Sequence, residues 1–173
     1  MTHHIGFVLD AVGDPDGLDI LDVGSRDWDG PGRDGSPRYE LEPRARSYLG
    51  VDVAEGPAVD RIVDVLDLAR TFGAAAFDVV ICDEVLEHVE DWRGAVANLK
   101  AVLRPGGLLV VEVPGPGFRR HAYPDDFWRF TLSDLVDILG DLRLVRVRDD
   151  PETAGTFIAA RSHRPARSPE PVP

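Results

Sequence analysis

The sequence lacks the features that mark secreted and membrane proteins. It has one cysteine, Cys82, so no internal disulfide can form and a reducing compartment is the default expectation. Its apolar runs are far shorter than the roughly 20 residues that span a bilayer. No basic region followed by a long apolar run stands at its start, as it would in a signal peptide. We therefore expect a cytoplasmic protein with no membrane partner.

Positive charge is also scarce. The formal net charge is −12, with 19 Lys and Arg against 31 Asp and Glu. A field of this sign repels phosphate backbones and disfavours a nucleic-acid partner, although Arg119, Arg120 and Arg129 can form a local basic patch. The length suits one domain. We place it at 18–161, after an N-terminal helix or lid (1–17) and before a tail (162–173) that is expected to be disordered.

Short apolar segments alternate with helical or loop segments along the chain. Because the apolar segments are apolar on both faces, they predict a doubly wound α/β fold with a mostly parallel sheet. Such sheets bind ligands outside the carboxyl ends of their strands, where strand order reverses. The expected strands are 18–23, 47–51, 61–65, 77–81, 108–113, 142–147 and 156–160. The expected helices are 5–12, 38–45, 92–103 and 132–139. Arg104-Pro-Gly-Gly is expected to end the third helix, and Thr131 or Ser133 to cap the fourth.

Four features follow these strands in a fixed order. Leu21-Asp22-Val23-Gly24 ends the first strand, and a glycine there permits a sharp turn and the close approach of a ligand. Asp52 closes the second strand, where a carboxylate can accept both hydroxyl hydrogens of a ribose. After the third strand, Asp64-Val65 offers a carboxylate for an adenine amino group and an apolar residue for the ring, and the nearby Asp60 or Asp67 can replace Asp64. The fourth feature runs from Phe77-Asp78-Val79-Val80-Ile81 through Glu84-Val85-Leu86-Glu87-His88-Val89 to Leu103-Arg104-Pro105-Gly106-Gly107.

Together these motifs resemble the class I S-adenosylmethionine (SAM)-dependent methyltransferases of the small-molecule group. The resemblance covers about 18–160. It implies a Rossmann-like sandwich with a seven-stranded sheet whose last strand is antiparallel, and methyl transfer to an O or N atom of a small acceptor, such as a sugar or secondary metabolite. By the resemblance, SAM as cofactor is assigned to Asp22, Gly24, Ser25, Arg26, Asp52, Val53, Asp64, Val65, Cys82 and Asp83.

The first loop departs from the usual family pattern. Arg26 stands where such families carry a second glycine, so it either narrows the methionine pocket or pairs with the cofactor carboxylate. A subgroup with a similar GSRD-x-x-G loop also carries an H-x-x-P-x-D-x-W-R-F-T segment. This chain has both, at Gly24–Gly30 and His121–Thr131, which favours retained cofactor binding.

The segment His121–Thr131 follows the fifth strand, on the rim where the cofactor is expected. Aromatic surface with a few polar groups is typical of a small-molecule pocket. Alternatively, its aromatic residues join the loop to the core and Arg129 pairs with Asp125 or Asp126. No metal site is predicted, because His121, Asp125 and Asp126 lack metal-like spacing. The candidate bases are His121 first, then Asp126 and His88. Alternatively, His88 has no catalytic role and forms hydrogen bonds only with the backbone. The candidate substrate contacts are Tyr123, Trp128 and Arg129.

Two other classes of function remain. One is a catalytically inactive accessory or regulatory protein that binds SAM, or nothing, and acts through a partner. The other is an NAD-dependent enzyme, against which the missing third glycine of G-x-G-x-x-G and the LRPGG turn both argue. The size leaves little room for a lid, so either the substrate is small and exposed or the second subunit of a homodimer completes the pocket.

Overall fold

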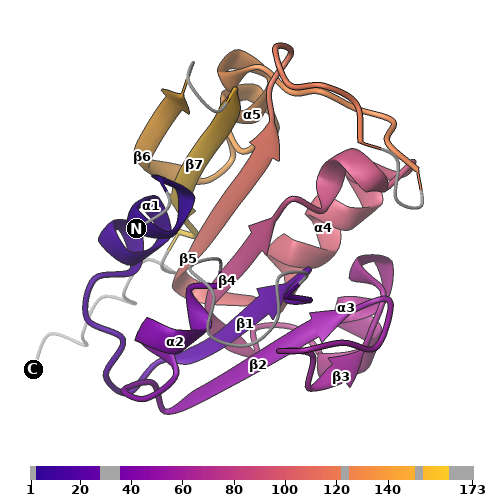
Figure 1. Cartoon of the computed structure of the whole chain (residues 1–173). Coiled ribbons are helices and arrows are strands. Elements are labelled where there is room, and N and C mark those ends of the chain that lie inside the picture. Colours follow the sequence, from indigo (N-terminus) through magenta and orange to yellow (C-terminus); the bar gives the residue numbers. More distant parts are fainter. Residues whose placement is uncertain (1–2, 28–35, 122–124, 151–153, 164–173) are drawn as a thin grey trace, which may run out of the picture.

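The computed structural model describes residues 3–27, 36–121, 125–150 and 154–163. Its centre is a sheet of seven strands in the order β3-β2-β1-β4-β5-β7-β6 (Figure 1). The strands are β1 Asp19–Val23, β2 Ser47–Asp52, β3 Arg61–Ile62, β4 Phe77–Asp83, β5 Leu103–Pro114, β6 Arg143–Asp150 and β7 Gly155–Arg161.

The pairing of the strands confirms the predicted doubly wound α/β fold. β7 pairs antiparallel with both β5 and β6, and the remaining pairs are parallel. Strand order reverses between β1 and β4, which lie side by side although β2 and β3 come between them in sequence. The carboxyl ends of β1, β2, β4 and β5 therefore meet at one edge of the sheet, where a ligand is expected.

Helices cover both faces of the sheet (Figure 1). On one face, α1 and α2 contribute to a cluster that includes Phe7, Val8 and Leu41. On the other face, α3, α4 and α5 contribute to a larger cluster that includes Leu68, Leu99 and Leu135. The helices are α1 His3–Val12, α2 Arg38–Leu41, α3 Leu68–Phe72, α4 Trp92–Val102 and α5 Leu132–Ile138, with 3₁₀ turns η1 Val65–Asp67 and η2 Leu86–His88.

The helix ends follow from local capping. The Asp91 carboxylate accepts a 3.0 Å hydrogen bond from the Gly94 amide and starts α4. Thr131 caps α5 in a reciprocal capping box with Asp134, as S/T-x-x-D/E-type patterns favour. The predicted Thr131 cap is thus confirmed.

Three segments differ from the expected strands. β3 is only two residues long, because Asp64 accepts a 2.9 Å bond from the Leu66 amide and turns the chain into η1. β5 begins at Leu103, so the RPGG residues enter the strand instead of forming a separate turn. β6 is an edge strand whose Leu144, Val145 and Val147 are exposed, so it is not covered on both faces.

Among the described residues, no helix has the length and apolar character needed to cross a membrane. The helix predicted at the N-terminus is α1, and it packs against the sheet: Phe7 lies 5.3 Å from Phe157 between ring centroids, and Asp10 pairs with Arg146 at 2.6 Å. The predicted tail lies almost wholly outside the described residues.

Candidate functional site

The turn after β1 lies against the connection that follows β4. Gly24 has a φ of +80°, a conformation that glycine adopts without strain. A Cβ atom there would lie 2.3 Å from Cγ2 of Val85 and 3.0 Å from the Asp83 carbonyl oxygen. The Gly24 amide also donates a 2.9 Å bond to the Val51 carbonyl of β2. Gly24 is therefore the point at which three strand ends come together.

Asp22 lies beneath this turn and is almost fully buried. Its Oδ2 accepts a 2.7 Å hydrogen bond from the Tyr48 hydroxyl. Burial raises the pKa of Asp22 to about 7; the Tyr48 bond opposes this shift, and the charge of Asp83 adds to it. The side chain therefore supports the turn from below through the bond to Tyr48.

The loop after β1 packs on the loop after β2. Ser25 donates a 3.1 Å bond from Oγ to the Ala58 carbonyl, and its side chain is buried there. A Cβ atom at Gly56 would lie 2.8 Å from Cγ of Arg26, so the stem of Arg26 runs along that loop. Ser25 and Arg26 are thus placed as contacts between the two loops.

Arg38 holds the loop after β2 in place, and the sequence analysis did not single it out. Its guanidinium pairs with Glu42 at 2.7 Å and with Asp60 at 2.8 Å, and it donates a 2.9 Å bond to the Ala58 carbonyl. Asp60 in turn accepts a 2.7 Å bond from the Gly50 amide. Only the pair with Glu42 is local, at i,i+4; because Ala58 and Asp60 are distant in sequence, no local pattern could have identified the bonds to the loop after β2.

A carboxylate and exposed apolar side chains meet at the ends of β2 and β3. Asp52 and Ile62 are paired in the register of the two strands, and Oδ1 of Asp52 accepts a 3.0 Å bond from the Ala54 amide. Val53 is 62% exposed and Ile62 is 53% exposed. Apolar side chains this open suit a flat aromatic ring, and the carboxylate beside them suits hydroxyl groups on a sugar joined to that ring.

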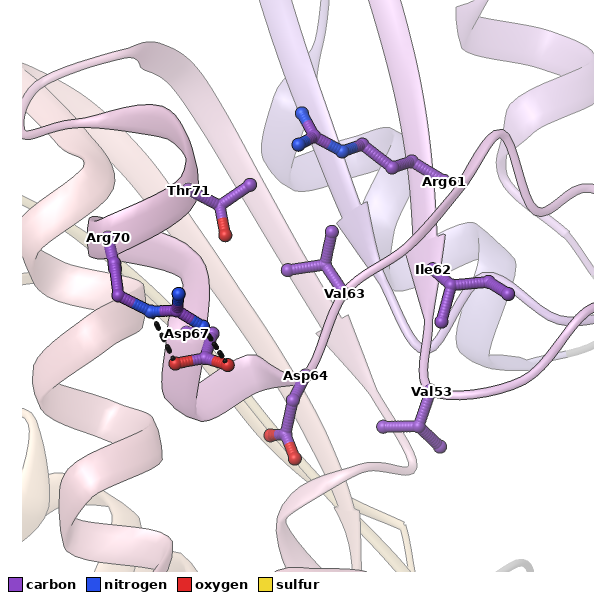
Figure 2. A pocket seen from close by; sticks show the side chains of 8 residues that line it. All are labelled: Val53, Arg61, Ile62, Val63, Asp64, Asp67, Arg70 and Thr71. Carbon is purple, nitrogen blue, oxygen red and sulfur yellow. Dashed lines mark hydrogen bonds and ion pairs between the residues drawn. The ribbon is translucent and has the colours of Figure 1, made fainter.

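A cavity of about 290 Å³ adjoins these side chains. Figure 2 shows Val53 and Ile62 on one side of it and the 2.6 Å Arg70–Asp67 ion pair on the other. Asp64 lines the cavity while its carboxylate caps η1. Val65, predicted to flank a ring, is instead buried in the core. The lining residues are Val53, Arg61, Ile62, Val63, Asp64, Asp67, Arg70 and Thr71.

The last two residues of β4, Cys82 and Asp83, have different surroundings. The Cys82 side chain is fully buried in the larger core cluster, and burial raises the pKa of its thiol well above the usual range. The prediction that Cys82 lies under the cofactor is therefore corrected for its side chain. Asp83, in contrast, stands beside Glu112 in the β4–β5 register.

Glu112 is a buried carboxyl group that the sequence analysis did not identify. Burial, together with the charge of Asp83 and a hydrogen bond to that residue, raises the pKa of Glu112 far above its usual range. The raised pKa favours the protonated form of Glu112, which can donate a hydrogen bond to Asp83. Only the register of two strands, Asp83 opposite Glu112, brings the pair together.

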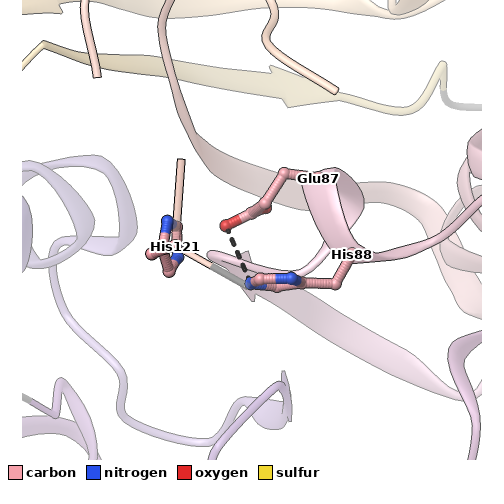
Figure 3. A group of neighbouring side chains, drawn as sticks. All are labelled: Glu87, His88 and His121. Carbon is pink, nitrogen blue, oxygen red and sulfur yellow. Dashed lines mark ion pairs between the residues drawn. The ribbon is translucent and has the colours of Figure 1, made fainter. Parts of the chain in front are cut away.

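The two candidate histidines lie together beyond β4 and β5. The rings of His88 and His121 meet edge-on, with centroids 5.1 Å apart. Nδ1 of His88 bonds to the Asp125 carbonyl, and Nε2 lies 3.5 Å from Oε1 of the buried Glu87. Figure 3 shows all three side chains converging. Oδ2 of Asp126 lies 3.6 Å from Nδ1 of His121, so folding brings all three predicted bases together.

Asp126 and Arg129 are used to hold this loop. Asp126 pairs with Arg129 and accepts a 2.7 Å bond from the His121 amide. The paired guanidinium holds the pKa of Asp126 well below its usual range, which makes Asp126 a weaker base than the two histidines. All five N–H donors of Arg129 are engaged, by Asp126 and by the carbonyls of Phe118, Arg119 and Trp128.

These bonds correct the prediction of Arg129 as a substrate contact, because no donor is left for a ligand. Trp128 keeps an open ring, 37% exposed, while its Nε1 donates a 3.0 Å bond to the Val89 carbonyl. Tyr123, the third predicted contact, lies outside the described residues. Of the predicted substrate side, Trp128 is the residue that the geometry leaves available.

Comparison with known proteins identifies the family. Residues 8–136 match the model of a methyltransferase domain. An uncharacterized 37.1 kDa protein in transposon TN4556 of Streptomyces fradiae is 33% identical over 132 residues, 68% of this chain and 36% of that protein. A ubiquinone biosynthesis O-methyltransferase of Coxiella burnetii is 36% identical over 53 residues, 31% of this chain and 23% of that protein. This chain thus spans about a third or less of the length of these relatives.

A solved structure shares the fold. The Burkholderia thailandensis 1,6-didemethyltoxoflavin-N1-methyltransferase, with bound 1,6-didemethyltoxoflavin and S-adenosylhomocysteine, superposes with a TM-score of 0.68 at 23% identity, over 92% of this chain and 76% of that one. The family match, together with this strand order, shows that the chain belongs to the class I SAM-dependent methyltransferases, within the methyltransferase domain family.

Proposed function

We propose that the protein transfers a methyl group from SAM to an O or N atom of a small-molecule acceptor. The observation that carries this proposal is the grouping of Asp52, Val53 and Ile62 at one strand edge, beside a cavity of about 290 Å³. A carboxylate suits ribose hydroxyl groups, and apolar side chains suit an adenine ring. The residues present therefore fit the nucleoside part of the cofactor.

Four more of the predicted cofactor residues, Gly24, Val53, Asp64 and Asp83, contact the cofactor in this proposal, together with Ile62, which the sequence did not predict. Val53 and Ile62 pack on the ring, and Asp64 at the cavity lining accepts from its amino group. The backbone at Gly24 and the side chain of Asp83 face the methionine part. Asp22, held by Tyr48, supports the turn without touching the ligand.

The reaction needs little covalent participation from the protein. Bound SAM supplies an activated methyl group on a sulfonium, so alignment of the acceptor is the main task. A lone pair of the acceptor atom forms the new bond to the methyl carbon, while the electrons of the broken C–S bond stay on sulfur. The acceptor proton leaves to a nearby base or to water. His121 and His88 are the side chains that fit the base, since Asp126 is committed to Arg129.

Supporting evidence on the acceptor comes from the names of similar proteins. The Coxiella burnetii relative is an O-methyltransferase, as is O-methyltransferase cnsE of Penicillium expansum, 40% identical over 67 residues. The Burkholderia structure is of an N-methyltransferase. These names favour an oxygen or nitrogen acceptor on a small molecule, and within that class we favour a sugar or secondary metabolite.

Calorimetric titration of S-adenosylhomocysteine into Asp52→Ala tests the cofactor site. Loss of two hydrogen bonds to a charged group, each worth about 1.5–3 kcal/mol, predicts binding weakened by at least about a hundredfold. Asp137→Ala, which removes an exposed carboxylate of α5, is the matched control and should bind as the unchanged protein does. Equal affinity in the Asp52 variant would overturn the assignment.

A further inference from the structure

Glu87, His88 and His121 form a cluster whose chemistry exceeds that of a general base. One carboxylate oxygen and one ring nitrogen from each histidine all lie within 4.8 Å of one another. Figure 3 shows the carboxylate pointing toward the two rings. Two imidazoles and one carboxylate are a common ligand set for divalent transition metals. Chain folding alone brings this set together, because His121 is remote from the other two in sequence.

Glu87 provides an independent sign that a cation belongs here. Its side chain is fully buried, and neither carboxylate oxygen meets a hydrogen-bond partner in another residue of the described chain. A buried carboxylate without partners costs several kcal/mol. A native structure keeps such a group mainly where a proton, a cation or a ligand completes it.

His88 is oriented as a metal ligand would be. Its Nδ1 bonds to the Asp125 carbonyl, which requires that the proton sit on Nδ1. Nε2 then carries a lone pair, and it lies 3.5 Å from Oε1 of Glu87. Two ligands of a tetrahedral zinc ion, with bonds of about 2.0–2.1 Å, stand about 3.3 Å apart. A backbone carbonyl behind a histidine fixes the ring in this way at metal centres.

His121 has a similar support. Oδ2 of Asp126 lies 3.6 Å from its Nδ1, so Nε2 is the nitrogen not turned toward that carboxylate. A carboxylate behind an imidazole orients the ring and increases its basicity toward a metal. Arg129 and the His121 amide hold Asp126 in place. The loop that carries the candidate base His121 therefore supplies a carboxylate behind the imidazole, as metal centres do.

The surrounding charges favour a cation. Glu84 and Asp83 both act on Glu87 with negative charge, against the opposing charge of Arg129. Glu84 itself takes a φ of +49°, a conformation that non-glycine residues adopt at a cost. The connection after β4 thus concentrates carboxyl groups beside two histidines.

From this geometry we propose that Glu87, His88 and His121 bind one divalent transition-metal ion, of the Zn²⁺ or Co²⁺ class. The two nitrogen ligands favour these ions over Mg²⁺ and Ca²⁺, which prefer oxygen. Three protein ligands leave at least one position open, as in catalytic metal sites. This cluster departs from the expectation of no metal site, which rested on spacing in sequence.

The open position suggests a role that rests on the proposed function. A hydroxyl of the acceptor that reaches the metal would release its proton more readily, because a bound divalent cation stabilises the oxyanion. The proton would pass to water, and no side chain would need to accept it. This role would restrict the acceptor to molecules whose reacting oxygen can bind the metal, either alone or together with a neighbouring oxygen.

Titration with Co²⁺ tests the site directly, because its visible absorption reports the ligand set. The full chain is freed of metal with a chelator and then titrated. We expect one Co²⁺ per chain, with competition by Zn²⁺. Glu87→Gln and His121→Ala should each weaken binding by at least about tenfold, since even the loss of partners behind a ligand costs about 10–100-fold.

Controls use the other histidines of the chain. His163 follows β7, which runs antiparallel to β5. The amide of the adjacent Ser162 donates to the Gly107 carbonyl near the start of β5. His163 therefore lies at the end of the sheet away from the cluster, which follows the carboxyl ends of β4 and β5. His163→Ala should bind Co²⁺ as the unchanged protein does, and so should the double variant His3→Ala, His4→Ala. The proposal would be overturned if the protein showed no saturable Co²⁺ binding, or if Co²⁺ binding survived both Glu87→Gln and His121→Ala.

Parallel calorimetry with S-adenosylhomocysteine separates this inference from the proposed function. Cofactor binding without Co²⁺ binding would leave the methyltransferase proposal standing and remove the metal site. Co²⁺ binding without cofactor binding would do the reverse. If Glu87→Gln fails to fold, His121→Ala decides the question alone, because the His121 side chain is 34% exposed and its loss leaves the core intact.

Discussion

The Tyr48 hydroxyl donates a 2.7 Å hydrogen bond to Oδ2 of Asp22, joining β2 to β1 directly beneath the Gly24 turn. Both residues are buried. The bond favours the charged form of a carboxyl group that burial otherwise keeps protonated. The site thus rests on a buried polar pair whose strength depends on pH.

Tyr48→Phe removes the donor and leaves a buried acceptor without it. We expect a loss of about 1–3 kcal/mol in the free energy of unfolding, larger at pH 8.5 than at pH 5, because the lost bond supports the ionised carboxylate. Urea denaturation at both pH values measures the two losses. A loss that is equal at the two pH values would show that Asp22 does not ionise in the folded protein over this range.

Asp22→Asn tests the same pair from the other side. The folded pKa of about 7 exceeds the unfolded value, so the folded state retains a proton that the unfolded state loses. The contribution of Asp22 to stability is therefore fully present below pH 4 and lost as pH rises to about 7. With about 1.4 kcal/mol per pH unit, the loss is on the order of 4 kcal/mol.

The asparagine variant cannot ionise, so its stability relative to the unchanged protein should rise between pH 4 and pH 8. Denaturation curves across that range give the comparison directly. A difference between the two proteins that stays constant with pH would contradict the raised pKa.

The sequence predicted the strand ends that carry the site because that information is local. A buried strand followed by Gly24, and another followed by Asp52, specify where a ligand approaches a doubly wound sheet. It could not show that Cys82 faces the core, because one residue of register decides which side of a strand faces the site, nor that the chain turns at Asp64 and buries Val65 in η1. Glu112 and Arg38 were missed for a related reason: their partners Asp83 and Asp60 come from other parts of the chain.

Asp19 is the first residue of β1, at the end of the sheet away from the proposed cofactor site, and it belongs to a charge network that should govern stability in acid. Arg46 and Arg104 bond to Asp19 and hold its pKa well below the usual range. Because this folded pKa is depressed, the contribution is fully present above the unfolded pKa near 4 and is lost as pH falls below it. Asp19→Asn should therefore be less stable than the unchanged protein at pH 7, by on the order of 1 kcal/mol for partly exposed pairs.

The two proteins should converge as pH falls from 4 toward 2. Thermal unfolding at pH 7, 4 and 2.5 follows the difference. An Asp19→Asn variant that is equally destabilised at every pH would indicate lost packing or hydrogen bonds instead of lost charge pairing.

Arg129→Lys tests whether the Asp126–Arg129 pair holds the loop in front of the two histidines. Lysine keeps the charge but cannot span two carboxylate oxygens and the carbonyls of Phe118 and Arg119 together. The His121 amide, which donates to Asp126, should then exchange with solvent at least about tenfold faster, since about 1.4 kcal/mol is a tenfold change in an opening equilibrium. Hydrogen exchange measured by NMR reports this amide separately.

Arg119→Lys is the matched control, because Arg119 is exposed and contributes its carbonyl to the network. The control should leave exchange at His121 unchanged.

If the Arg129 variant behaves like the control, the guanidinium does not order the loop. Its five donors would then be free to turn toward a ligand, and the original prediction of a substrate contact at Arg129 would regain its basis. If only the Arg129 variant exchanges faster, the position of His121 depends on a residue that touches no reacting atom, and Co²⁺ affinity should fall in the same variant.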